Sequence, residues 1–478
     1  MYSKNLYGMV ILGGLLTGCA AGPDYVRPSV AMPEKFLGQA QADDRKTATD
    51  LAAWWSGFED PTLTQYVTKA LAQNLDLTQA LARVTQARAG LSAANASLLP
   101  AGVISTQGTR AYQSVETPLG QVLNASPGFD RSGESYDVNL GASWEMDIFG
   151  SLRRGRQAAV ADYQATEAGV VATRLTVAAQ TAEIYISIRG LQARLDIARR
   201  QVKTRQDLLA TVNRLYSQGL AAEFQVRQAE AALSQAGASI PALEVALDQT
   251  MNAFDVMLGT PPGAHREELA NVTAIPMTPA LTGVGSPADL LRRRPDLIAA
   301  DRRLEAANAR IGVAMAEYYP KLSLTGMIGS STSVAGSNLF THAASQSAGI
   351  LGLRWRLFDF GRIDARIDQA KGQEAELLAA YRIAALHATE DVENALSALM
   401  KYKEQTAILA QGASSLDRAR GASYSAYQQG VVSLVDVLQA DENLLRASDA
   451  LARAQTDSAR AAVSAFKALG GGWQPRNT

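Results

Sequence analysis

Residues suited to catalysis are few in this chain and lie far apart. There are three histidines, His265, His342 and His387, and a single cysteine, Cys19. His265 lies in a proline-rich stretch, His342 in a predicted surface loop and His387 in the middle of a predicted helix. No nucleophile motif or phosphate-binding glycine loop accompanies them. We therefore expect each histidine to be solvated or packed, and we expect no enzyme activity, no cofactor and no metal site.

Cys19 is the one residue with a predicted covalent modification. Before it come a basic start at Lys4 and an apolar run from Leu6 to Leu16, which is shorter than the about 20 residues of a spanning helix. This pattern resembles the bacterial lipoprotein signal, in which the cysteine takes a lipid and becomes the N-terminus. Because Ala20 is not aspartate, the resemblance implies delivery to the outer membrane. The alternative is an ordinary secretory signal with an unrelated cysteine.

Charge gives little support to polyanion binding. The net charge is −1, so we expect no nucleic-acid partner. Arg292, Arg293 and Arg294 stand together before Pro295. This run could form an anion site, but it is more typical of the exposed start of a helix.

The elements that position these residues are arranged as a repeat. Trp144 to Gly150 reads WEMDIFG, and residues 355–361 read WRLFDFG. Gly150 and Gly361 are 211 residues apart (361 − 150), and so are Gly219 and Gly430 (430 − 219). One offset at two distant points indicates an internal two-fold repeat of a strand that leads into a long helix.

Helical patterns alternate with strand patterns in both halves. The expected helices are 62–99, 151–213, 222–258, 288–319, 362–429 and 433–469, and the expected strands are 103–112, 136–149, 321–328 and 351–357. A helix of some sixty residues spans about 90 Å, more than a globular domain needs. A heptad in it, Leu195, Val202, Leu209 and Tyr216, indicates helices wound on one another, with Arg205 interrupting the seam.

The strands have one apolar and one polar face. Trp144 alternates with Glu145, and Trp355 alternates with Arg354 and Arg356. This pattern fits lipid on one side and water on the other, so we interpret these residues as barrel strands. Four strands cannot close a barrel, so we expect other copies of the chain to complete it. Three copies would give twelve strands, a number that the family resemblance given below helps to choose. The alternative is the half-buried edge of a soluble sandwich.

We divide the chain into six segments. These are a signal peptide (1–18), an extended equatorial segment (19–61), a first repeat (62–259), an equatorial linker (260–286), a second repeat (287–469) and a C-terminal tail (470–478). Trp54 and Trp55 are expected to anchor the extended segment, whose alternative is a flexible tether. The fold class is thus an α+β membrane protein, with strands for a shared barrel and coiled helices for a periplasmic tunnel.

Several stretches resemble the outer-membrane efflux proteins of the TolC type, in the lipoprotein branch that includes OprM-like and NodT-like proteins. They are residues 19–25, 54–61, 215–233 and 292–326 and both tryptophan blocks, in the family's order. The resemblance implies a passive homotrimeric exit duct for small toxic compounds. It also implies a periplasmic adaptor and an inner-membrane transporter of the resistance–nodulation–division class as partners. The alternatives are a duct for polypeptides, as in type I export, and a coiled-coil scaffold.

In this family the closed end of the duct lies at the helix turns, where the adaptor docks. The matching turns end at Gly219, after Tyr216, and at Gly430, after Tyr427. The resemblance implies gate roles for Tyr427 and for Asp436, six residues past Gly430.

The chain departs from the family's gate pattern at two positions. Gln439 replaces a second aspartate, and Val432 replaces an arginine, which puts the salt-bridge part of the gate in doubt. Gln225 and Glu223 are the counterparts in the first half. Alternatively, Asp436 and Asp441 are the solvated start of a helix, where acids suit the helix dipole. Both readings stay open for Asp436, and the second is favoured for Asp441.

Overall fold

The computed structural model describes residues 20–37, 51–281, 285–334 and 336–474. The predicted signal peptide and lipid site at Cys19 lie outside these ranges. The chain forms two compact units. The first contains residues 85–165 and 301–379 with the start of the chain to Pro28, and the second contains 29–84, 166–300 and 380–478.

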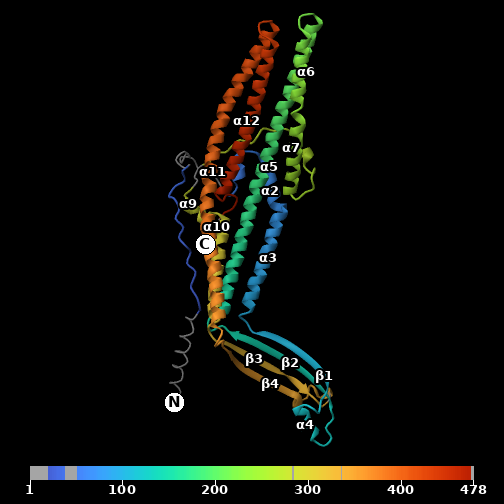
Figure 1. Cartoon of the computed structure of the whole chain (residues 1–478), viewed down its shortest axis with the longest axis vertical. Coiled ribbons are helices and arrows are strands. Elements are labelled where there is room, and N and C mark those ends of the chain that lie inside the picture. The colour runs from blue at the N-terminus through green and yellow to red at the C-terminus, as the bar shows by residue number, and fades with distance from the viewer. Residues whose placement is uncertain (1–19, 38–50, 282–284, 335, 475–478) are drawn as a thin grey trace. The chain divides into compact units, whose positions relative to one another are not determined.

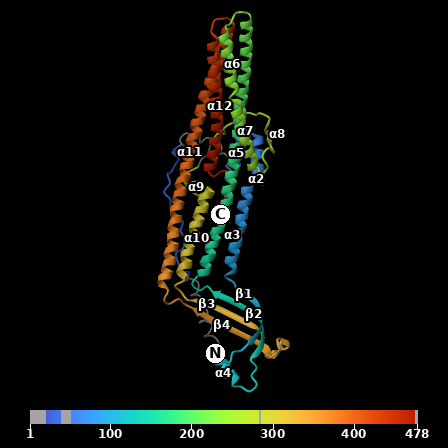
Figure 2. The same cartoon turned by 45° about the vertical axis from the view of Figure 1, so that its right-hand side comes forward.

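The first unit contains one antiparallel sheet in the order β1-β2-β3-β4 (Figures 1 and 2). Its strands are β1 (Ala101–Tyr112), β2 (Ser132–Met146), β3 (Lys321–Thr332) and β4 (Ser345–Arg354). A short helix, α4 (Pro118–Asn124), lies in the connection from β1 to β2, which we expected to be loop. Each half of the chain therefore supplies one hairpin, and β2 joins β3 between the halves.

One face of the sheet carries apolar rows that cross several strands. Leu140 lies opposite Ile104 on one side and Ile328 on the other. Four residues along, Leu324 lies opposite both Trp144 and Leu351. All six of these side chains are exposed. Glu145 is on the other face, near Lys321.

The prediction for the end of the last strand was wrong. β4 ends at Arg354, so Trp355 and Arg356 lie beyond it. Trp355 instead donates its indole N–H to the carbonyl oxygen of Tyr318, at 2.9 Å. Trp144 makes the matching bond to the carbonyl of Leu98, at 3.0 Å. Each indole N–H is thus bound to the chain just before a strand of its own half.

The helical bounds correct several expected helices. The described helices are α2 (Pro61–Gln73), α3 (Leu75–Ala96), α5 (Ser151–Ser217), α6 (Glu223–Gly237), α7 (Ile240–Met257), α8 (Arg266–Leu269), α9 (Pro287–Arg293), α10 (Pro295–Ala316), α11 (Phe360–Gln428) and α12 (Leu434–Ala468). Three helices expected to be continuous are broken in two. Asn74 is extended and its side chain caps α3, and Arg294 is extended because it precedes Pro295. The third break, at Ala238 and Ser239, stands just before Pro241 in the first turn of α7.

Small residues let the helices of the first unit approach closely. Ala158 and Ala161 of α5 pack against Ala306 and Ala309 of α10. The N-terminal segment is fastened to the same helices. Its Ala21 N–H donates to the carbonyl of Phe149, at 3.0 Å, just before α5.

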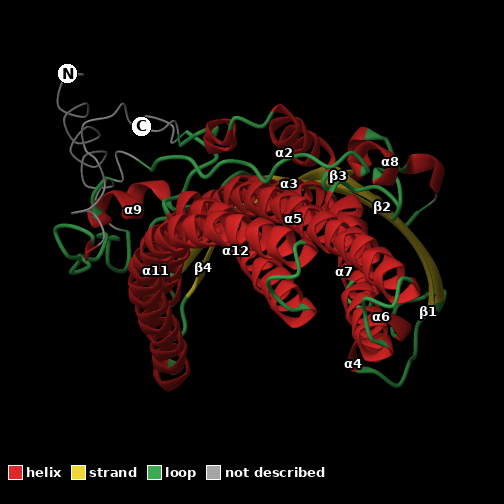
Figure 3. Cartoon of the chain, turned by 90° about the horizontal axis from the view of Figure 1, so that it is seen from above, coloured by secondary structure: helices red, strands yellow, loops and turns green. Residues whose placement is uncertain are grey.

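The second unit holds the main hydrophobic core, formed where α5, α7, α11 and α12 lie alongside one another (Figure 3). A 3₁₀ turn, η2 (Trp54–Phe58), enters this core. Trp54 is 1% exposed and stacks on Phe466 of α12, with ring centroids 5.4 Å apart. Trp55 is buried as well, so both tryptophans anchor their segment. None of the described helices is both long and apolar enough to cross a membrane.

Candidate gate at the helix turns

The two turns at the predicted gate have the same backbone geometry. Gly219 and Gly430 have φ of 74° and 73°, a conformation that costs glycine no strain. After Gly219, the N–H of Leu220 donates to the carbonyl of Leu215, at 2.8 Å. After Gly430, the N–H of Val431 donates to the carbonyl of Ala426, at 2.9 Å. Each long helix thus ends in a Schellman motif, and the next helix starts within a few residues.

The helices that follow the turns start with matching caps. The Gln225 side chain accepts from the N–H of Ala222, at 2.9 Å. The Asp436 carboxylate accepts from the N–H and the hydroxyl of Ser433, at 2.9 and 2.6 Å. These hydrogen bonds from Ser433 hold the pKa of the exposed Asp436 carboxyl below its usual value. Within one chain Asp436 therefore acts as a capping residue, and its carboxylate remains open to solvent.

Tyr427 and Asp436 are not joined within the chain. Among the described contacts no hydrogen bond links them. Tyr427 is half-buried against an apolar cluster, and burial raises the pKa of its hydroxyl. The buried members of that cluster are Leu208, Val212, Val226, Ala229, Leu434 and Val437.

The other predicted gate residues bind neighbours on their own helices. Gln439 donates to Asn443, at 3.0 Å, and Glu223 pairs with Arg227, at 3.3 Å. Both pairs are exposed. They leave the side chains accessible from outside the chain.

Sequence reasoning missed an exposed apolar patch at the turns. Leu220 and Phe224 beside the first turn are 73% and 67% exposed, and Val431 and Val435 beside the second are 73% and 54% exposed. Val431 lies 211 residues after Leu220, and Val435 lies 211 residues after Phe224, so the repeat offset could have identified them. Tyr216 adds a partly exposed ring at 47%. We call these five residues the tip patch.

Below the turns, polar side chains lie buried between α5, α11 and α12. Arg205 of α5 pairs with Glu442 of α12 at 3.4 Å, and Arg420 of α11 pairs with Asp441 of α12 at 2.9 Å. Asp441 is 1% exposed. The favoured prediction, that it belongs to the solvated start of a helix, is therefore wrong. Together with the buried Gln201 these four residues form what we call the buried charge layer. The sequence signal for it was Arg205 in an otherwise apolar seam.

Two of the histidines have charged partners among the described residues, and none of these printed contacts is to a hydroxyl group. Nδ1 of the buried His265 lies 2.6 Å from Asp255, and its Nε2 lies 2.7 Å from the Lys69 amine. His387 is exposed and pairs with Glu390 at 2.9 Å, and His342 lies in the short turn η4 (His342–Ala344). In the part of the chain that the structure describes, no three metal-ligating side chains gather.

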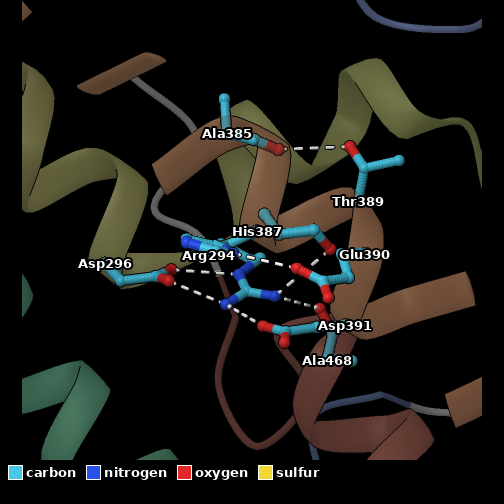
Figure 4. A network of polar contacts seen from close by, with 9 residues as sticks. Arg294, Asp296, Ala385, His387, Thr389, Glu390, Asp391 and Ala468 are labelled. Atoms are coloured by element: carbon cyan, nitrogen blue, oxygen red, sulfur yellow. Dashed lines mark hydrogen bonds and ion pairs between the residues drawn. The ribbon is translucent and has the colours of Figure 1, made fainter. Parts of the chain in front are cut away.

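The Arg294 side chain points into the protein, toward two carboxylates of the chain, and is not free to bind an anion from solution (Figure 4). Its guanidinium donates to Asp296 and to Asp391, at 2.7 and 2.9 Å. It also donates to the carbonyl oxygens of Ala388 and Ala468. Its role is thus to join the α9–α10 break to α11 and α12.

Comparisons with known proteins place this architecture. A model of the outer membrane efflux protein family matches residues 66–260 and 287–471. The chain belongs to that family. As an outer membrane efflux protein it is similar to nodulation protein T of Rhizobium leguminosarum bv. viciae, with 31% identity over 483 residues, 99% of this chain and 94% of the relative. It is also similar to the pyoverdine export outer membrane protein OpmQ of Pseudomonas putida, with 31% identity over 442 residues, 92% of this chain and 91% of the relative.

A solved structure agrees with this assignment. The outer-membrane channel OprN superposes with a TM-score of 0.86 at 31% identity, covering 96% of this chain and all of that one (100%). The efflux protein described here therefore has the fold of the TolC-type outer-membrane channels, rich in helix with a four-stranded sheet, and its location is the outer membrane.

Proposed function

We propose that this chain is the exit duct of a tripartite efflux pump, in which three copies form one passive conduit through the outer membrane. The observation that carries the proposal is the sheet. In the described chain β1 pairs only with β2, and β4 only with β3, so both edges are open. An open edge is incompatible with hydrocarbon, because its backbone N–H and C=O groups have no partners there.

Copies of the same chain can close this sheet. In the simplest closed arrangement, β1 of one copy pairs with β4 of the next. Three copies give a shared barrel of twelve strands with the apolar rows facing lipid, a size that encloses a water-filled lumen. The alternative of a soluble sandwich edge is disfavoured because large apolar side chains such as Ile104 and Leu353 are 72% and 66% exposed on the sheet.

The two helix turns are the proposed periplasmic entrance. Around a three-fold axis three Asp436 carboxylates would form an acidic ring, which attracts cations. Tyr427 would contribute from its position against the apolar cluster. The tip patch fits a second role, because exposed apolar side chains at the end of a helical hairpin are typical of a protein contact site. We assign this contact to a periplasmic adaptor, which links the duct to an inner-membrane transporter of the resistance–nodulation–division class.

The cargo class is small toxic compounds. One relative is named for export of pyoverdine, a small molecule, and this supports small cargo over polypeptides. A type I secretion duct for polypeptides is the second candidate. A lipid on Cys19 completes the proposal and would anchor each copy to the outer membrane.

Mass measurement in mild detergent tests the shared barrel. We expect a particle of three chains, and a monodisperse monomer would contradict the proposal. Planar-bilayer recording tests the gate. The paired substitution Tyr427→Ala with Asp436→Ala should raise the open fraction. The control Lys401→Gln, on an exposed ion pair of α11, should leave it unchanged. If the paired variant records like wild type, these two residues are not the gate.

Growth assays test the cargo. A strain that lacks the gene should become more sensitive to several small toxic compounds, and the wild-type gene should restore resistance. Unchanged sensitivity together with loss of a secreted polypeptide would favour the type I alternative.

A further inference from the structure

The buried charge layer stands where the seam between the long helices would ordinarily be apolar. Arg205 occupies a position in the helical seam between Gln201 and Leu208, all three of which are buried. Apolar residues at such positions give the tightest packing, and a buried charge is costly to desolvate. A polar layer at this place therefore needs a reason other than stability.

The layer lies close to the turns. Arg205 is three turns before the end of α5 at Ser217, and Asp441 is two turns after the start of α12 at Leu434, by about 3.6 residues per turn. Arg420 lies about two turns before the end of α11 at Gln428. The charged residues of the layer thus join α11 and α12 to α5, just behind the tip patch.

The hydrogen bonding of the layer is incomplete. Asp441 accepts from Arg420 through Oδ1, but its buried Oδ2 has no partner among the described residues. The buried Nε of Arg205 and the buried amide nitrogen of Gln201 have none either. Two of the layer's members reach solvent, since Glu442 and Arg420 are 30% and 28% exposed. Water therefore has a route to the layer along α11 and α12.

Such a layer makes the seam easy to separate. When two apolar helix faces part, both become exposed to water, which is unfavourable. When the charge layer parts, the unpartnered atoms gain water as a partner, and the charged groups regain hydration. The free-energy difference between the packed and the parted seam is therefore smaller than for an apolar seam.

We propose that the buried charge layer is the release point of the duct, at which α12 separates from α5 when the entrance opens. This inference rests on the proposed function and deepens it. It assigns the energetics of opening to Arg205, Asp441 and Glu442, which are positioning residues behind the turns, and not only to Tyr427 and Asp436. Opening consists of hydration of the layer, with Arg205 exchanging Glu442 for water.

Two variants with opposite expected effects, one double and one single, test the proposal in the full-length protein. Arg205→Met combined with Asp441→Leu removes the two fully buried charges of the layer. Arg420 is then free to turn to solvent, and Glu442 keeps its pair with Arg446. The open fraction of this double variant in planar bilayers should fall at least about fivefold, the effect of roughly 1 kcal/mol of coupling, while its unfolding temperature in detergent rises. Glu442→Gln leaves Arg205 buried without an anionic partner, so its open fraction should rise by a similar factor and its unfolding temperature should fall. Lys401→Gln, on the exposed ion pair of Lys401 with Glu404, is the control and should change neither.

The outcomes separate this inference from the function on which it rests. Wild-type protein that never conducts, with or without Tyr427→Ala and Asp436→Ala, refutes the duct and the release point with it. Conducting protein whose open fraction is the same in both layer variants, or shifts in the same direction in both, refutes the release point alone. A purely structural layer would move the unfolding temperature and leave the open fraction unchanged. Glu442→Gln decides the question even if the double variant does not assemble.

Discussion

The attachment of the N-terminal segment offers a prediction whose size follows from the structure. Asp301 of α10 is 2% exposed and accepts from the hydroxyl of Tyr25 at 2.6 Å and from Arg27 at 2.7 and 3.1 Å. It also accepts from Arg302 at 2.6 Å. These bonds hold the N-terminal segment of residues 20–28 on α10. The same segment is held at Ala21, whose N–H donates to the carbonyl oxygen of Phe149. Asp301→Asn keeps the shape and one acceptor oxygen but removes the charge.

We expect Asp301→Asn to lower the free energy of opening of this segment by about 2–3 kcal/mol. Breaking a buried ion pair costs about 3–5 kcal/mol, and a hydrogen bond to a charged group contributes about 1.5–3 kcal/mol. We use a value below the range for a fully buried ion pair, because the Arg27 side chain is 48% exposed and can regain water. Since about 1.4 kcal/mol corresponds to a factor of ten, local exchange should accelerate about 30- to 140-fold.

Amide hydrogen exchange over residues 20–28, read by mass spectrometry, measures this rate. The matched control is Asp24→Asn in the same segment. Asp24 is 90% exposed, and its partner Arg154 keeps its bonds to the carbonyls of Ala21 and Gly22. The control should exchange within about twofold of wild type, as expected for an exposed ion pair. Acceleration of less than about fivefold in Asp301→Asn, or an equal effect of both variants, would refute the reasoning.

Three further predictions follow from single sites. Burial alone would raise the pKa of Asp301, but the hydrogen bonds from Arg27, Tyr25 and Arg302 outweigh it and hold the pKa below its usual value. The stability that Asp301 gives the N-terminal segment is therefore complete above about pH 4, the unfolded pKa of aspartate, and is lost as the pH falls through the lower pKa of the folded state. Exchange of this segment that begins to accelerate at about pH 6 would contradict this. Trp54→Ala should cost about 3–5 kcal/mol in denaturant unfolding. Trp54→Phe should cost far less, because the indole nitrogen has no hydrogen-bond partner among the described residues, and equal losses would show that ring packing is not the cause. Gly312→Ala should also accelerate exchange over residues 20–28, because its Cβ would lie 2.7 Å from the carbonyl oxygen of Ala21, whereas Gly155→Ala, with open space around it, should not.

The sequence predicted the regular elements well because their patterns are long. Alternation identified all four strands, and the proline-free runs identified α5 and α11 to within a few residues. The misses are local. Asn74 reads as one polar residue in a helical pattern, and only its side-chain cap on α3 reveals the break. The alternation through Trp355 continued past the true end of β4, because the indole is held by the carbonyl of Tyr318 and not by strand pairing.

The gate was harder to predict because partners across helices are not encoded by spacing. Asp436 carries the same signal whether it caps a helix or lines an entrance, and the structure gives it the first role within one chain. Arg205 was recognised as an interruption, but nothing near it in the sequence identifies Glu442, 237 residues away, as its partner. The repeat offset pairs the valines of the tip patch with Leu220 and Phe224, but that these side chains are exposed is seen only in the structure.

The two open edges of the sheet have a consequence for biogenesis. A newly exported copy presents the outer backbone of the 12-residue β1 and of the 10-residue β4 to the periplasm. Such edges can pair with any available strand, so the assembly with sister copies that we propose would compete with aggregation. The outcome depends on concentration, and low expression slows the productive reaction more than it slows unimolecular folding. Chaperones that shield these strands during transit would therefore raise the yield of finished particles without altering the stability of any one copy.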